Sequence, residues 1–188
     1  MLALDVRRLH QRDRTTDFRS GNELLDQFFR GYAKKNEAQR TTATFVACVA
    51  DAIVGFVTIA PKSVQSAMLR EHVRKLAKHD TPVLLIARMA TDSRFQSKGV
   101  GATLLRDAVF ARAAILADGF GCVGVYVDPK AAAVPFYAKH GFMPLPGSED
   151  PSPMFLPLET VLSAMGVVGL TVKLGGPALH PPGAGLIT

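Results

Sequence analysis

A glycine-containing loop between an apolar run and a helix-like run is the segment whose residue types point most directly to chemistry. The loop, residues 96–101, reads Gln-Ser-Lys-Gly-Val-Gly; the apolar run 83–90 precedes it and the run 103–116 follows it. A strand that passes through such a loop into a helix presents unpaired backbone N–H groups to an anion, with the positive end of the helix dipole behind them. The glycines let a phosphate approach the main chain, and the lysine adds positive charge. The segment is therefore predicted to bind a pyrophosphate.

The loop has two other interpretations. Two glycines in a charged turn also occur in ordinary connections between a strand and a helix. A dinucleotide-binding fingerprint is disfavoured, because that motif needs GxGxxG together with an acidic residue about twenty positions further on. Asp128 does end the next strand-like run, residues 122–127, but the glycine pattern differs. On spacing alone, pyrophosphate binding and a plain turn both remain open.

A second motif, Phe-Tyr-Ala-Lys-His-Gly-Phe at residues 136–142, lies downstream of the loop. The order of strand, QxxGxG loop, amphipathic helix, apolar strand, short helix and this motif resembles the GNAT family of acetyl-CoA-dependent N-acetyltransferases over residues 1–160. The resemblance implies an α/β (α+β) fold in which about four helices flank a mixed, mostly antiparallel sheet of six to seven strands, splayed between its two central strands. We therefore expect one acetyltransferase domain at 1–160, followed at 161–188 by a helix end and a Gly/Pro-rich arm.

The resemblance also implies acetyl-CoA as the co-substrate, without a metal ion. Two sets of residues match the family's coenzyme-binding positions. The expected pyrophosphate contacts are Gln96, Ser97, Lys98, Gly99, Val100, Gly101 and Ala102. The expected main-chain contacts to the pantetheine arm and the acetyl carbonyl come from Met89, Ala90 and Thr91.

The tyrosine of the second motif is the expected catalytic residue. In the family this element places a tyrosine hydroxyl near the coenzyme sulfur, so the resemblance implies that Tyr137 protonates the departing thiolate. A phenol with a reference pKa of about 10 can return a proton to a thiolate whose reference pKa is about 8.5. Without the resemblance, the spacing of Val134, Tyr137 and Ala138 favours a half-buried aromatic residue that packs the short helix.

Composition and charge indicate a single intracellular domain. A chain of 188 residues that is 48% hydrophobic and 20% charged can bury one sizeable core. Residues 1–10 carry charged side chains where a signal peptide needs an apolar segment, and no apolar stretch of about twenty residues follows, so neither secretion nor a membrane span is expected. Cys48 and Cys122 lie in apolar runs, which predicts reduced core residues and a cytoplasmic location.

Periodicity and turn residues predict alternating strands and helices. A helix capped by Asn22 is expected to place Leu25, Phe28, Phe29 and Tyr32 on one face. A second helix is expected at 63–78, with Leu69, Val73 and Leu76 facing inward. The predicted strands are residues 2–9, a hairpin of 42–49 and 53–60, a central strand from 81, the run 122–127, and the short segments 142–145 and 154–158.

Basic residues are patterned along the first half of the chain, whose net charge overall is +6. Arg70, Arg74 and Lys78 fall at i, i+4 and i+8 of the predicted helix 63–78, and Lys34 and Lys35 follow the first helix. Such stripes neutralise phosphates and steer a polyanion toward a cleft. A solvated helix face accounts for them equally well.

Three further segments resemble a narrower group, the GNAT toxins of bacterial type II toxin-antitoxin pairs. They are FxxGNxxLDxFF at 18–29, YAKKNEAQR at 32–40 and IARMA at 86–90, although Lys35 to Gln39 replaces the tight Asn-Gln pair more usual after the helix. Those toxins acetylate the amino group of charged transfer RNA and block translation; they are commonly homodimers, and a ribbon-helix-helix antitoxin wraps them. The resemblance implies aminoacyl-tRNA as the acceptor, held by Lys34, Lys35, Arg70, Arg74, Lys78 and Arg88.

The acceptor has alternatives, since a housekeeping GNAT acting on a protein N-terminus or a small amine would share the coenzyme site, as would a non-catalytic regulator. An N-acetyltransferase needs a neutral amine, and an α-amine with a pKa of about 7.7 to 8.0 is far closer to neutral than a lysine with a pKa of about 10.4. Residues 83–135 contain four acids, Asp92, Asp107, Asp118 and Asp128, none obviously placed as a base. The sequence thus favours an α-amine, with Glu23, Asp26 or water left as possible bases.

Overall fold

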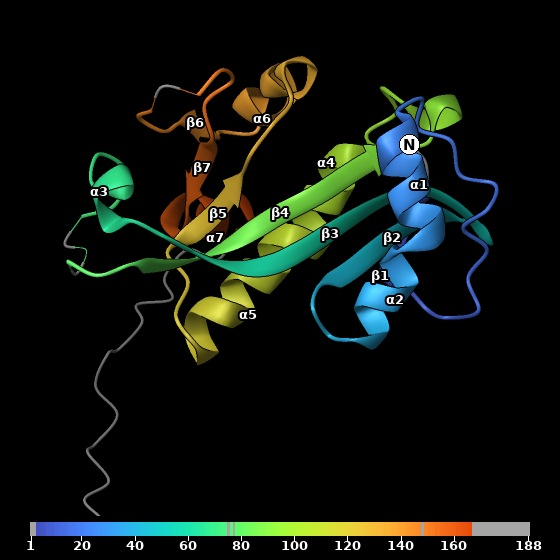
Figure 1. The fold of residues 1–188 in the computed structure, drawn as a ribbon, viewed down its shortest axis with the longest axis horizontal. Helices are drawn as coiled ribbons and strands as arrows, with labels where there is room; N and C mark the ends of the chain where they lie inside the picture. Colours follow the sequence, from blue (N-terminus) through green and yellow to red (C-terminus); the bar gives the residue numbers. More distant parts are fainter. Residues whose placement is uncertain (1–2, 75, 77, 148, 167–188) are drawn as a thin grey trace, which may run out of the picture.

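Seven strands form one sheet in the computed structural model, which describes residues 3–74, 76, 78–147 and 149–166 (Figure 1). The spatial order is β1-β2-β3-β4-β5-β7-β6, and every neighbouring pair is antiparallel except β4 with β5. The strands are β1 Asp5–Arg8, β2 Ala43–Val49, β3 Ala52–Val64, β4 Thr81–Thr91, β5 Gly124–Val127, β6 Met143–Pro144 and β7 Met154–Pro157. The predicted mixed, mostly antiparallel sheet is confirmed, as is the predicted hairpin, which is β2 and β3.

Helices cover both faces of the sheet, with α1 and α2 in front of the strands and α4 and α5 behind them in Figure 1. The helices are α1 Glu23–Gly31, α2 Ala33–Ala38, α3 Ser66–Leu69, α4 Val100–Leu104, α5 Ala111–Gly119, α6 Val134–Lys139 and α7 Leu158–Ala164. Helix α4 continues into α5 through a π-helical stretch, Leu105–Phe110, and single 3-10 turns form at Ser93–Phe95 and Ala131–Ala133.

The front face is closed by aromatic packing from α1. Asn22 caps this helix by accepting a hydrogen bond from the Leu25 backbone N–H at 3.3 Å, as predicted. Phe29 is fully buried and stacks on Phe56 of β3, with ring centroids 4.3 Å apart, and Phe18 packs edge-on against both rings. Tyr32, expected on the same inward face, is instead 59% exposed at the end of the helix. The helix therefore buries one narrow stripe and leaves its outer side open.

The rear face is closed by the long helix that begins at α4. Gly55 of β3 permits a close approach there, because a Cβ at that position would come within 2.6 Å of the Val100 side chain. Leu104 and Leu105 pack beneath the sheet, and the π-helical stretch continues the buried surface with Ala108, Val109 and Phe110. The first turn of α4 is thus pressed against the middle of β3.

The predicted helix at 63–78 is wrong. Residues 61–64 extend β3 and pair with Thr81, Pro82, Val83 and Leu84 of β4, which leaves only the single turn α3 before the chain turns back. Leu69 is nonetheless buried, and Val73 and Leu76 pack against the same small cluster beside β5 and β7. These residues do pack inward, as their spacing predicted. The helix does not form because residues 63 and 64 belong to β3 and pair with β4.

Both cysteines are buried and unbonded, as predicted. Residues 161–166 complete helix α7 and the turn after it, whereas the arm expected at 167–188 lies outside the described residues. Within the described part of the chain, no helix is long and apolar enough to span a bilayer. No group of three or more His, Cys, Asp or Glu side chains is placed to bind a metal ion among these residues.

Truncation of Phe29 tests the front core. We expect Phe29→Ala to lower the free energy of unfolding by about 3–5 kcal/mol, because it removes a fully buried ring that touches two other rings. Leu24→Ala, on the exposed side of the same helix, should change it by no more than about 0.5 kcal/mol. Urea unfolding of the full chain measures both, and equal effects would contradict this description of the core.

Candidate active site

A cavity of about 410 Å³ opens where β4 and β5 part. The two strands pair only from Leu84 to Ile86 of β4, and β5 ends at Val127. Ala87 is an extra residue in β4, since Arg88 pairs with Thr58 while Ile86 pairs with the next residue of β3. Beyond this bulge β4 is bonded to β3 alone, so its other edge offers unpaired main-chain groups to the cavity.

The glycine loop lies at one end of this cavity and has the geometry of an anion site. Gly99 has φ +86° and occupies the N-cap of α4, where no side chain caps the helix. The backbone N–H groups of the first turn, residues 100–102, therefore lack helical partners. Gly101 lets the Phe136 ring approach, because a Cβ there would come within 3.1 Å of it. The loop is thereby held against helix α6, which carries Tyr137.

Two loop side chains have structural partners. The Gln96 amide donates a hydrogen bond to the Ser20 carbonyl oxygen at 2.9 Å, so it ties the loop to the turn before α1. The Lys98 ammonium donates to the Arg94 carbonyl oxygen at 2.8 Å and lies 5.2 Å from the Phe95 ring centroid. The loop therefore presents mainly its main-chain N–H groups to an anion, since these two side chains are hydrogen-bonded within the protein.

Asp92 anchors the start of the loop and is not available as a base. Its carboxylate is fully buried, pairs with the Arg94 guanidinium at 2.8 Å and accepts the Arg19 backbone N–H at 3.2 Å. Burial by itself would raise the pKa of this carboxyl, but the hydrogen bonds from Arg94 and from the backbone of Arg19 and Arg94 outweigh it and lower the pKa. Asp92 therefore anchors the start of the loop in its ionised form.

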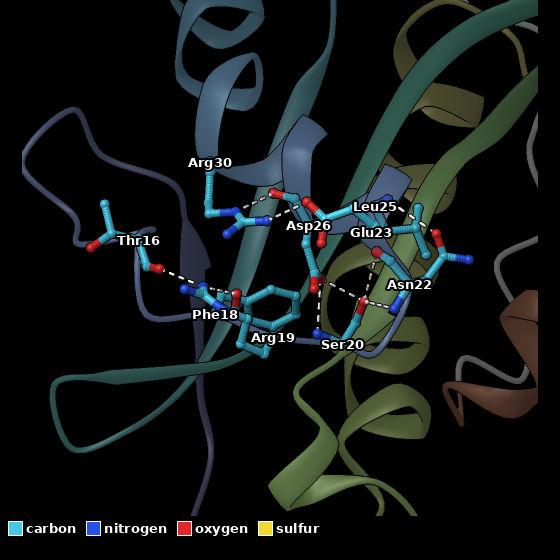
Figure 2. A network of polar contacts seen from close by, with 9 residues as sticks. All are labelled: Thr16, Phe18, Arg19, Ser20, Asn22, Glu23, Leu25, Asp26 and Arg30. Carbon is cyan, nitrogen blue, oxygen red and sulfur yellow. Dashed lines mark hydrogen bonds and ion pairs between the residues drawn. The ribbon is translucent and has the colours of Figure 1, made fainter.

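The turn before α1 is built around a second buried carboxylate, that of Asp26 (Figure 2). Asp26 is 2% exposed and accepts the Ser20 hydroxyl at 2.6 Å and the Ser20 backbone N–H at 2.8 Å. Arg30 reaches back to the Asp26 carbonyl oxygen and pairs with Glu23 at 3.0 Å. These contacts place Ser20 and Asn22 in the wall of the cavity. The FxxGN motif is thus a scaffold: the Asp26 carboxylate is occupied by the Ser20 turn, and the exposed Glu23 side chain lines neither this cavity nor the one beside it.

Tyr137 lines the same cavity from the opposite side. It is 5% exposed, and its ring packs edge-on against Phe136 and Phe142, each with centroids 5.2 Å away. Burial raises the pKa of the Tyr137 hydroxyl well above its usual range. The phenol consequently keeps its proton at neutral pH and is in the form that a proton donor requires.

A second cavity, of about 720 Å³, adjoins the first on the front face. It lies between α1, α2 and the middle of β4. The two cavities share Leu25, Ile86, Ala87, Arg88, Asp128 and Lys130. Exposed apolar side chains, Leu24 at 69% and Tyr32 at 59%, form part of its wall. Two ligands could therefore bind, one in each cavity, and meet at the bulge in β4.

The sequence model of the acetyltransferase (GNAT) domain matches residues 40–144, which include the bulged strand, the glycine loop and Tyr137. This chain belongs to the GNAT family. The fold and the splayed sheet expected from the family resemblance are thereby confirmed.

Individual relatives of this GNAT chain include toxins. A tRNA-acetylating toxin of Mycobacterium tuberculosis is 36% identical over 121 residues, which cover 64% of this chain and 72% of that protein. A bacterial toxin crystal structure superposes with a TM-score of 0.81 at 22% identity, covering 88% of this chain and 97% of the other. AtaT complexed with acetyl-methionyl-tRNAfMet gives a TM-score of 0.75 at 21% identity, covering 86% and 98%. The two structural likenesses establish a shared fold.

Several of the predicted coenzyme residues lie at the cavity where β4 and β5 separate. Met89, Ala90, Thr91 and Gln96 line the first cavity. The remaining residues of the loop, 97–102, continue from it along the surface to the first turn of α4. The structure thus brings Met89, Ala90, Thr91 and Gln96 into one cavity with Tyr137, with the rest of the loop next to it in the chain.

The predicted acceptor residues are more scattered. Arg88 lines both cavities, and its guanidinium lies 4.0 Å from the Phe28 ring centroid. Lys34 donates a hydrogen bond to the Asp13 carbonyl oxygen, and Lys35 is exposed on α2. Arg70 and Arg74 line a different cavity beside the N-terminal end of β5, and Lys78 is exposed in the turn before β4. Because the helix 63–78 does not form, these last three residues do not make a helical stripe.

Sequence reasoning left two residues of the shared wall without a role, Asp128 and Lys130. Asp128 ends a strand-like run, and it was one of the four acids in residues 83–135 that the sequence did not obviously place as a base. Its position after β5 was a usable signal, because ligands of open sheets gather beyond the carboxyl ends of parallel strands and β5 is the parallel partner of β4.

Paired substitutions at Gly99 test the anion site. We expect Gly99→Asp to abolish acetyl-CoA binding in calorimetry, because it places a carboxylate where the pyrophosphate should approach the first turn of α4. Gly99→Asn is the matched control, since Asn has the same shape without the charge and tolerates the left-handed φ of +86°. Equal loss in both variants would indicate that backbone strain, and not charge, explains the effect.

Proposed function

We propose that this chain transfers the acetyl group of acetyl-CoA to the α-amino group of an aminoacyl-tRNA and blocks translation as the toxin of a toxin-antitoxin pair. The observation that carries the proposal is the pair of cavities that meet at the bulge in β4, with the glycine loop and Tyr137 at one and an open, partly cationic wall at the other. The 36% identical relative named as a tRNA-acetylating toxin supports the choice of acceptor.

The first cavity fits acetyl-CoA as a substrate. The uncapped first turn of α4 and the left-handed Gly99 form a cradle for a diphosphate, which a side chain or an acidic residue would spoil. The free edge of β4 from Ala87 to Thr91 offers main-chain groups to an extended, amide-containing arm and to a thioester oxygen. Bound acetyl-CoA supplies an activated acetyl group whose carbonyl carbon a neutral amine attacks.

The residues of the chain then have separable tasks. The main-chain N–H groups of β4 stabilise negative charge on the carbonyl oxygen as the new N–C bond forms. Tyr137 donates its proton to the sulfur as the C–S bond breaks, and burial keeps the hydroxyl protonated until then. Leu25 and the Ser20 turn hold the opposite wall in place, so the two reactants meet in one geometry.

The second cavity suits the acceptor. Its exposed apolar residues, Leu24 and Tyr32, can contact an amino-acid side chain, while Arg88 and Lys130 bring positive charge to the approach of a phosphate backbone. Lys34 and Lys35 on the adjoining α2 extend this charge, and Arg70, Arg74 and Lys78 would contact a more distant part of the same RNA. The reaction would take place in the cytoplasm, where charged tRNA is found.

Two finer features follow from the resemblance to GNAT toxins. The partner of this toxin would be a ribbon-helix-helix antitoxin, and the active form would be a homodimer. A housekeeping role in acetylating a protein N-terminus or a small amine is the second candidate, because the coenzyme cavity would be the same. The open, partly cationic wall of the second cavity favours an RNA acceptor over a protein N-terminus or a small amine.

Transfer of labelled acetyl from acetyl-CoA to bulk charged tRNA tests the acceptor. We expect incorporation into aminoacyl-tRNA and none into the same tRNA after deacylation, because the reactive amine belongs to the amino acid. Growth should arrest when the chain is produced without its antitoxin. Incorporation into N-terminal peptides, without incorporation into tRNA, would support the housekeeping alternative instead.

The proton-donor role is tested by Tyr137→Phe, which removes the hydroxyl and keeps the packing of the ring. We expect turnover to fall by roughly 100-fold or more, with acetyl-CoA affinity in calorimetry close to that of the wild type. Growth arrest should disappear in the same variant. Near-wild-type turnover would exclude Tyr137 as the acid.

A further inference from the structure

Asp128 occupies the point where the two cavities meet. It is the first residue after β5 and lines both cavities, and among the described residues that line either one it is the only acid. Among the other nearby carboxylates, Asp26 is bound by the Ser20 turn and Asp92 by Arg94, while Glu23 is exposed and lines neither cavity. An amine that passes from the front cavity to the thioester therefore meets one carboxylate.

Two neighbours contact the Asp128 carboxylate, whose side chain is 55% exposed. The Tyr126 hydroxyl donates a hydrogen bond to Oδ1 at 2.7 Å, and the Lys62 ammonium lies 3.3 Å from Oδ2 and 4.1 Å from the Tyr126 ring centroid. Burial raises the pKa of Tyr126, and the hydrogen bond and charge of Asp128 raise it further, so this phenol remains a donor. A carboxylate has about four lone-pair positions, and these two contacts leave room for another donor.

The surrounding charges come from several elements. Lys62 belongs to β3, Arg88 to β4 and Lys130 to the segment after β5, and the charge of Glu149 acts on Tyr126 from the β6–β7 connection. Lys62 pairs with one oxygen of the Asp128 carboxylate, and the hydrogen bond from the Tyr126 hydroxyl engages the other oxygen. The arrangement is that of a carboxylate oriented for a ligand on its open side.

We propose that Asp128 binds the amino group of the acceptor and takes its proton during acetyl transfer, an inference that rests on the proposed function. As the amine nitrogen bonds to the carbonyl carbon, one N–H proton passes to the Asp128 carboxylate. The C–S bond breaks, its electron pair goes to sulfur, and Tyr137 protonates that sulfur. Water later returns a proton to Tyr137 and removes one from Asp128, so the balance is one amide and one thiol formed.

Asp128→Asn is the first test. The amide oxygen can still accept the Tyr126 hydrogen bond, which preserves the local fold, but it cannot take a proton. We expect kcat/KM for aminoacyl-tRNA to fall roughly 100-fold, with acetyl-CoA affinity in calorimetry unchanged. Asp118→Asn, an exposed acid on α5 outside both cavities, is the matched control and should keep wild-type activity.

Chemical rescue of Asp128→Ala is the second test and separates a chemical role from a structural one. Added formate should restore part of the turnover of this variant and have no such effect on Tyr137→Phe. An active wild type with Asp128→Asn within about 3-fold of it, a change small beside the 10²-fold effect of a general base, would overturn the inference while leaving the proposed function intact. Absence of rescue in a folded, coenzyme-binding Asp128→Ala would also overturn it. A wild type that acetylates no aminoacyl-tRNA would overturn the proposed function itself.

Discussion

One backbone irregularity, the bulge at Ala87, determines the layout of the site. From Leu84 to Ile86, β4 is paired with a strand on both edges, and beyond Ile86 on one edge only. An unbonded strand edge inside a protein is costly unless something satisfies its polar groups. Here the free edge of β4 faces a cavity, so its unpaired N–H and C=O groups are available to a substrate. The first and second cavities both exist because β5 does not follow β4 past this point.

The walls of the site come from distant parts of the chain, and buried polar contacts join them. The Ser20 turn is bonded to the glycine loop through Gln96, and the Arg19 backbone is bonded to Asp92 and Ser93 at the start of that loop. These bonds are buried or partly buried, where leaving either partner unsatisfied costs about 1–3 kcal/mol. On the other side Phe136 packs against Gly101. Movement of the loop would therefore disturb both the α1 turn and the helix that carries Tyr137.

Features with a local signal could be predicted from the sequence, and features set by pairing between distant segments could not. The Asn22 cap, the glycine loop and the position of Tyr137 depend on short motifs. The structure forms the cap, places Gln96 at the start of the loop in one cavity with Tyr137, and packs Gly101 of the loop against Phe136. The helix at 63–78 failed because the pairing of residues 61–64 with the start of β4 is a non-local choice that periodicity does not reveal. The buried spacing of Leu69, Val73 and Leu76 is compatible with either outcome.

The same distinction explains why the acids were difficult to assign. In the sequence, Asp26, Asp92 and Asp128 are equivalent carboxylates, and only their partners separate them. Asp26 is buried and accepts the Ser20 backbone N–H and hydroxyl, and Asp92 is buried against Arg94 and backbone N–H groups. Asp128 instead stands at an open junction with a phenol and an ammonium on one side. A carboxylate that is fully satisfied by its own chain has no capacity left for a substrate. The chemistry of this site is therefore decided less by which acids are present than by which one the fold leaves incompletely bonded.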